Sequence, residues 1–267
     1  MRPFFIICLS AFCLSALSAQ DYNILDFGAI PDGTTLNTAH IQAAIDAASL
    51  QGRGRVIIPS GRFLTGSIIM KSGVELHILP GGVLLGSTHP EDYVKLNRWK
   101  ALIMADHQEN ISITGPGEVD GQGRRLALNL DSLFYIGQLD SADYEFPEMR
   151  PKWYLRPQLI EFVNCKHIMV QGITLKNAAC WVQTYDQCED IVLDRVQIES
   201  DAYWNNDGID IQDCRNVSIT NCFVNAADDG ICLKSQSPDH RCDSIYVADC
   251  TVRSSASAIK FGTVSHG

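Results

Sequence analysis

The chain has 267 residues, hydrophobic residues at 46% of its positions and a net charge of −10 at neutral pH. This length is enough for one large domain with its own core. The acidic balance excludes nucleic acid as an expected partner, and any anionic ligand must be met by local positive charges.

The first 19 residues have the features of a secretory signal peptide. Arg2 gives the positive start, residues 4–17 are apolar, and the small residues Ser18 and Ala19 follow. The apolar stretch is too short to span a bilayer, and no later run is long enough. We therefore expect an exported protein, periplasmic or extracellular, with one domain over residues 20–267. Loss of Arg2 leaves 20 basic and 31 acidic residues, a net charge of −11.

A helix is expected early in the mature chain, and short strands follow it. Asn37 or Thr38 can cap a helix that runs to about Leu50. Its apolar residues fall on one face, and they are Ile41, Ala44, Ile45 and Ala48. The segments that read as strands are 56–59, 65–70 and 74–78.

A repeat organises the second half of the chain. Four similar segments begin with a cysteine, at intervals of 23, 26 and 28 residues: Cys165, Cys188, Cys214 and Cys242. Eight residues after each cysteine comes a second apolar position, occupied by Ile173, Val196, Cys222 and Cys250. Repeats of this length with alternating β-branched residues predict an all-β fold of stacked coils, a parallel β-helix whose open end the N-terminal helix covers.

The eight cysteines after the signal peptide all lie within residues 165–250. They are expected either as stacked, buried thiols or, in part, as one or two disulfides. Their coil-repeat spacing does not fit a metal site built from cysteine and histidine. Residues 124–155 interrupt the periodicity and are expected to form an inserted loop beside a cleft.

Two acidic clusters are the main candidates for chemistry. Asn205-Asn206-Asp207 and Asp228-Asp229 are separated by 21 residues from Asp207 to Asp228, which is nearly one repeat. Parallel strands are spaced ~4.8 Å apart, so one coil brings the carboxylates together. Like charges in one place move carboxyl pKa values apart, which lets one acid donate a proton while another accepts one. For an isolated Asp pair, capping of a turn is the alternative interpretation.

The acidic clusters stand in an ordered series of short motifs that covers nearly all of the mature chain. The motifs are Asp26-Phe27-Gly28-Ala29, Pro59-Ser60-Gly61, Leu79-Pro80-Gly81-Gly82, Asp120-Gly121-Gln122-Gly123, Arg156-Pro157, Asn177 with Trp181, Asn205-Asn206-Asp207-Gly208 and Asp228-Asp229-Gly230-Ile231-Cys232-Leu233-Lys234-Ser235. The series resembles glycoside hydrolase family 28, the polygalacturonase family.

The resemblance implies a right-handed parallel β-helix of the pectin lyase-like type that hydrolyses pectic chains with inversion. It implies a monomer without cofactor or metal, acting on a pectic polysaccharide or oligosaccharide. Asp228 matches the general acid, and Asp207 and Asp229 match the carboxylates that activate water, for which inversion requires ~6.5–9.5 Å between acid and base. Asn205, Lys234 and Lys260 are the candidate substrate contacts.

Two departures from the family pattern affect the expected specificity. The family has Gly-His-Gly one coil after the Asp pair, where this chain has Ser254-Ser255-Ala256-Ser257-Ala258. Lys260 and His266 are the candidates to replace the histidine. A later Arg-x-Lys motif of the family does not occur before Gly267, which suggests a truncated chain whose last coil is uncapped.

Two other functions are compatible with the same scaffold. A pectate or rhamnogalacturonan lyase would use Ca²⁺ held by carboxylates and a basic residue that abstracts a proton. A catalytically impaired β-helix would bind carbohydrate without releasing reducing ends.

Overall fold

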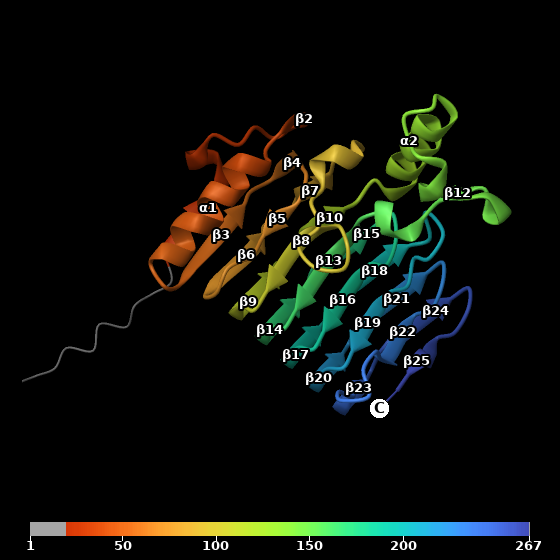
Figure 1. Cartoon of the computed structure of the whole chain (residues 1–267). Helices are drawn as coiled ribbons and strands as arrows, with labels where there is room; N and C mark the ends of the chain where they lie inside the picture. The colour runs from red at the N-terminus through yellow and green to blue at the C-terminus, as the bar shows by residue number, and fades with distance from the viewer. Residues whose placement is uncertain (1–19, 267) are drawn as a thin grey trace, which may run out of the picture.

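The computed structural model describes residues 20–266, and the predicted signal peptide at residues 1–19 lies outside the described residues. The strands form three parallel sheets that run the length of a right-handed β-helix (Figure 1). The first coil adds strands to two of the sheets, and every later coil adds one strand to all three, so the predicted all-β solenoid is confirmed. None of the helices within residues 20–266 is long and apolar enough to cross a membrane.

The three sheets are named A, B and C. Sheet A contains β1 (Gln20–Asn23), β3 (Gly54–Ile58), β6 (Val74–Ile78), β9 (Glu109–Thr114), β14 (Lys166–Gln171), β17 (Glu189–Asp194), β20 (Arg215–Thr220) and β23 (Asp243–Ala248). Sheet B contains β2 (Asp32–Leu36), β4 (Gly61–Thr65), β7 (Gly82–Gly86), β10 (Glu118–Asp120), β15 (Thr174–Lys176), β18 (Gln197–Ser200), β21 (Phe223–Ala226) and β24 (Thr251–Ser254). Sheet C contains β5 (Ile68–Ile69), β8 (Ala101–Asp106), β13 (Gln158–Val163), β16 (Gln183–Asp186), β19 (Ile209–Gln212), β22 (Ile231–Ser235) and β25 (Ile259–Ser265).

Helix α1 (Thr38–Leu50) lies at the N-terminal end of the coil stack (Figure 1). Its predicted apolar face is confirmed, since Ile41, Ala44, Ile45 and Ala48 are all buried in the core. The predicted side-chain cap is wrong. Asn37 stands at the N-cap position, but its amide instead bonds the backbone of Ile30 and Thr35.

The expected strand over 65–70 is divided in two. Strand β4 ends at Thr65 and β5 begins at Ile68. Gly66 lies between them, where an added Cβ would come within 2.0 Å of the Asp92 carbonyl oxygen. The chain therefore turns from sheet B to sheet C at a residue without a side chain.

The cysteine repeat forms the predicted column. Register pairs Lys166 with Glu189, Glu189 with Arg215 and Arg215 with Asp243, so the cysteines that precede these residues stack on successive coils. All eight cysteines that follow the predicted signal peptide are free thiols, and six of them are buried. The structure therefore has buried thiols and not the alternative disulfides.

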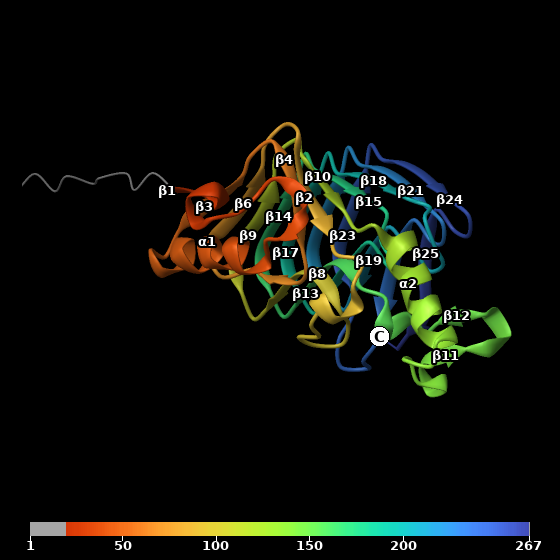
Figure 2. The ribbon, with the colours of Figure 1, turned by 90° about the horizontal axis from the view of Figure 1, so that it is seen from above.

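The inserted segment is more ordered than the expected loop. Residues 123–135 form helix α2 (Gly123–Tyr135), whose buried residues include Leu126, Ala127 and Leu130. A short antiparallel pair follows, β11 (Tyr144–Glu145) and β12 (Arg150–Pro151), and Figure 2 shows this unit projecting from the coil stack. The remaining short 3₁₀ helices are η1 (Ile24–Phe27), η2 (Pro90–Asp92), η3 (Ser141–Asp143), η4 (Phe146–Glu148) and η5 (Trp153–Leu155).

Candidate active site

The two acidic clusters meet at the start of neighbouring strands in sheet C. Asp207 precedes β19 and Asp229 precedes β22, and the Gly208 amide donates to the Asp229 carbonyl at 2.9 Å. Ile209 pairs with Ile231, so one coil spans 22 residues here. Asp229 is therefore the residue one coil from Asp207, and the partly exposed Asp228 is its chain neighbour. The 21-residue interval from Asp207 to Asp228 misses the true register by one residue.

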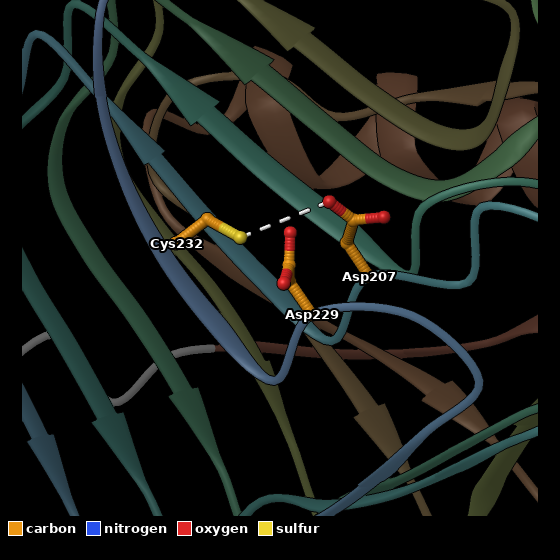
Figure 3. A group of neighbouring side chains, drawn as sticks. All are labelled: Asp207, Asp229 and Cys232. Atoms are coloured by element: carbon orange, nitrogen blue, oxygen red, sulfur yellow. Dashed lines mark hydrogen bonds between the residues drawn. The ribbon is translucent and has the colours of Figure 1, made fainter. Parts of the chain in front are cut away.

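Asp207, Asp229 and Cys232 form one buried cluster (Figure 3). One carboxylate oxygen of each aspartate and the Cys232 Sγ all lie within 4.8 Å of one another. The Cys232 thiol donates to Asp207 Oδ2 at 3.7 Å. The fold thus places two carboxylates from successive coils next to each other, away from bulk water.

The two carboxylates of the cluster pair with different lysines. The Lys234 ammonium lies 3.4 Å from Asp207 Oδ2 and also pairs with the fully buried Asp210. The Lys260 ammonium lies 2.6 Å from Asp229 Oδ2. His266, the other candidate to replace the missing histidine, is exposed, whereas Lys260 reaches the acidic cluster.

The surroundings of the two carboxylates set different protonation states. Burial, and then the charge of Asp210, raises the pKa of Asp207 to about 8, against the opposing charge of Lys234. Burial also acts to raise the pKa of Asp229, but the hydrogen bond and charge of Lys260 outweigh it and lower that pKa below its usual value. Asp229 is therefore the ionised member of the pair near neutral pH, and Asp207 retains a proton more readily.

The cluster does not fit a calcium site. Ca²⁺ takes six to eight oxygen ligands, whereas this group offers two carboxylates and a thiol, and burial raises the pKa of the Cys232 thiol. Both carboxylates also already pair with lysine ammonium groups, which would repel a cation. The donor set is that of an acid–base site and not that of a hard-cation site.

Asn205 and Asn206 fix the loop that carries Asp207. Asn205 Oδ1 accepts bonds of 2.8 Å from both Arg150 and Arg156. The buried Asn206 side chain accepts from the amides of Ala202 and Tyr203 and donates to two carbonyls of the preceding coil. The inserted segment is thereby tied to the acidic cluster through Asn205.

Several residues at the site were not selected from the sequence. Asp210 lies in the alternating segment Ile209-Asp210-Ile211, whose period of two shows that Asp210 faces away from the core. Three tryptophans gather beside Lys234, with ring centroids 4.0 Å apart for Trp99 and Trp153 and 4.7 Å apart for Trp99 and Trp181. They line a cavity of about 300 Å³ together with Arg98, Arg150 and Lys234.

The buried Glu161 supports Trp99 in the wall of this cavity. It is 1% exposed, and its Oε1 accepts from the Trp99 amide at 3.0 Å. Burial raises the pKa of Glu161 to about 7, against the opposing hydrogen bonds from the amides of Trp99 and Arg98. A buried carboxyl of this kind is more stable in its protonated form.

Glu161 is therefore expected to make folding stability depend on pH. Its folded pKa lies above the unfolded value, so the stabilisation is complete below about pH 4.5 and is lost as the pH rises toward 7. The loss amounts to about 3 kcal/mol at 1.36 kcal/mol per pKa unit. Urea unfolding at pH 5 and pH 7.5 measures it. Glu161→Gln, which keeps an acceptor for Trp99, is expected to reduce the difference between the two pH values, and an unchanged difference contradicts this assignment.

Comparison with known proteins places the chain in a family. Residues 50–253 match the model of glycosyl hydrolases family 28, and residues 22–77 match that of rhamnogalacturonase A/epimerase, pectate lyase-like. A probable polygalacturonase of Vitis vinifera is 28% identical over 85% of this chain and 47% of its own length. The exo-poly-alpha-D-galacturonosidase of Dickeya chrysanthemi is 27% identical over 78% of this chain and 41% of its own. The chain spans about half the length of the curated relatives it matches.

Solved structures agree with this placement. A putative glycosyl hydrolase from Parabacteroides merdae superposes with a TM-score of 0.75 at 31% identity, over 87% of this chain and 98% of its own. The exopolygalacturonase of Thermotoga maritima superposes with a TM-score of 0.73 at 29% identity, over 92% of this chain and 63% of its own. The parallel β-helix, the acidic cluster on sheet C and these matches lead to one conclusion: the chain belongs to glycosyl hydrolase family 28.

Proposed function

We propose that the protein hydrolyses glycosidic bonds in a pectic polysaccharide or oligosaccharide, with inversion at the anomeric carbon. The observation that carries the proposal is the pairing of Asp207 and Asp229 on successive coils, with Asp228 beside them. The family match and the names of the relatives, which are polygalacturonases, support a galacturonate-containing chain as substrate. We further propose export to the periplasm or cell exterior and action as a monomer.

The three aspartates are proposed to divide the acid and base roles. Asp228, partly exposed, donates a proton to the leaving glycosidic oxygen. Asp229, kept ionised by Lys260, accepts a proton from the attacking water, and Asp207 accepts a hydrogen bond from that water or orients it. In the net reaction the glycosidic bond breaks and a bond forms between the water oxygen and the anomeric carbon. The leaving sugar gains a hydroxyl group with the proton from Asp228, and the water oxygen becomes the hydroxyl group on the anomeric carbon.

The product distinguishes this proposal from a lyase on the same scaffold. A hydrolase releases saturated reducing ends, whereas a lyase leaves an unsaturated sugar that absorbs in the ultraviolet. Reducing-end and absorbance assays on several pectic polysaccharides, with Asp228→Asn as the blank, decide between them. Calcium-dependent ultraviolet absorbance supports the lyase, and binding without any cleavage supports a carbohydrate-binding protein.

Plain homogalacturonan is expected to be cleaved more slowly than a branched or decorated pectic chain. The small side chains of Ser255, Ala256 and Ser257 replace the family histidine, which removes one polar partner and opens space near the site. Changes of this kind shift discrimination by orders of magnitude when a buried group loses its partner. Initial rates on equal concentrations of linear and branched substrates test the expectation. Equal rates would show that Lys260 restores ordinary specificity.

A further inference from the structure

A cavity of three tryptophans and two arginines adjoins the acidic cluster and has no role in the proposed proton transfers. It is bounded by Trp99, Trp153, Trp181, Arg98 and Arg150. It is contiguous with the cluster through Lys234, whose ammonium lies 3.7 Å from the Trp181 ring centroid and 3.4 Å from Asp207. The lining residues come from six separate stretches of the chain, between residues 98 and 264, so the cavity exists only in the folded coil stack.

The walls of the cavity are rigidly supported. Trp99 is held by the hydrogen bond from its amide to buried Glu161, and its ring packs on both Trp153 and Trp181. Arg150 is fixed by Asn205 and by an ion pair with Glu148. Preformed aromatic walls with a few fixed polar groups are typical of small-molecule sites.

The charges on the cavity favour an anionic ligand. Lys234 and Arg150 are already neutralised by carboxylates. Within residues 20–266, the exposed Arg98 guanidinium has no carboxylate ion-pair partner and lies over the Trp99 ring, 5.1 Å from its centroid. The charge of Arg98 acts on the carboxyl groups of Glu161 and Asp186, but neither forms a close ion pair with it, so its exposed guanidinium can bind a ligand carboxylate beside the apolar wall. A planar guanidinium binds carboxylates with two parallel hydrogen bonds.

We propose that this cavity is a second sugar subsite that binds a uronic acid residue, with the sugar ring against Trp153 and its carboxylate on Arg98. The proposal rests on the proposed function for the identity of the polymer. It adds the residues that recognise the charged sugar next to the one being cleaved. It also explains how an acidic protein binds an acidic polymer next to three aspartates. The positive charge that attracts the sugar carboxylate is confined to the cavity.

Binding can be measured without turnover in the Asp228→Asn variant, by calorimetry or by the fluorescence of the tryptophans. Trigalacturonate and the same trimer with its carboxyl groups reduced to alcohols are the two probes. Arg98→Gln is expected to weaken trigalacturonate binding about tenfold to a hundredfold, the range for one lost charged hydrogen bond, and to leave the reduced trimer unaffected. Trp153→Ala is expected to weaken both probes, because the ring contact does not depend on charge.

Arg53→Gln is the matched control, since it removes an exposed positive charge near the N-terminal end of the stack and leaves the cavity intact. Unchanged trigalacturonate affinity in Arg98→Gln, or an equal loss for both probes, overturns the proposal, as does the absence of trigalacturonate binding in the parent variant. The proposed hydrolysis is judged separately, by the release of reducing ends from polymer by the unsubstituted protein. Either idea can therefore fail while the other stands.

Discussion

Replacing Asp228 with asparagine is expected to lower kcat by about 10²–10⁴-fold, the contribution of a well-placed general acid. The amide is close in size and shape to the acid but has no proton to give to the leaving oxygen. Substrate binding precedes that transfer, so KM is expected to change far less than kcat. Steady-state rates on the best pectic substrate, with and without the substitution, provide the measurement.

Two comparisons make this result specific to Asp228. Asp26→Asn removes an exposed carboxylate in η1, at the N-terminal end of the chain, and is expected to leave kcat unchanged. Asp229→Asn is also expected to be severe, because it removes the ionised carboxylate that Lys260 stabilises. If the Asp228 variant retains full activity, the acid must be sought elsewhere in the cluster, and the proposed division of roles is wrong.

Replacing Lys234 with methionine is expected to have the largest effect on stability. Its ammonium is the shared partner of Asp207 and Asp210, and Asp210 is fully buried. Removing one member of a buried ion pair leaves an uncompensated charge and costs about 3–5 kcal/mol. The free energy of unfolding, measured in urea at pH 7.5, is therefore expected to fall by about this amount.

The pH dependence separates charge from packing in the Lys234 variant. Without the lysine, both aspartates bind protons more tightly in the folded state than in the unfolded chain, so the penalty is expected to be smaller at pH 5 than at pH 7.5. Lys166→Met is the control, since its pair with Glu189 is solvent-exposed and is expected to contribute little to stability. A Lys234 variant that loses the same stability at both pH values would point to lost packing against Trp181.

The coil repeat was predictable from sequence because the fold itself repeats. Each coil presents the same position to the same neighbour, so Cys165, Cys188 and Cys214 mark one column and fix the register of sheet A. Helix α1 was predictable for a similar reason, since the geometry of a helix sets the spacing of the apolar residues that face the core. The acidic residues were found because their motifs are contiguous in sequence.

The cavity was not predictable in this way. Arg98, Trp153 and Trp181 belong to connections outside the strands, and no period relates them. Helix α2 lies in a segment without the coil period, and its apolar residues Leu126 and Leu130 pack against a partner that the sequence does not identify. The pairing of Asp207 with Asp229, and not with Asp228, depends on the length of a single coil, which varies along the chain.

The stacked thiols have a consequence for recovery after heat damage. In the folded protein each thiol of the column Cys165, Cys188, Cys214 and Cys242 donates to a backbone carbonyl. The Cys188 thiol donates to Phe162 and the Cys214 thiol to Tyr185, both at 3.3 Å. Once the coils separate, these thiols become accessible to oxidants and to one another. Disulfides formed in the opened chain join residues that the native stack keeps as separate rungs, so they block refolding. In an oxidising compartment the lifetime of the protein is then set by how rarely the coils open, and not by how readily they close again.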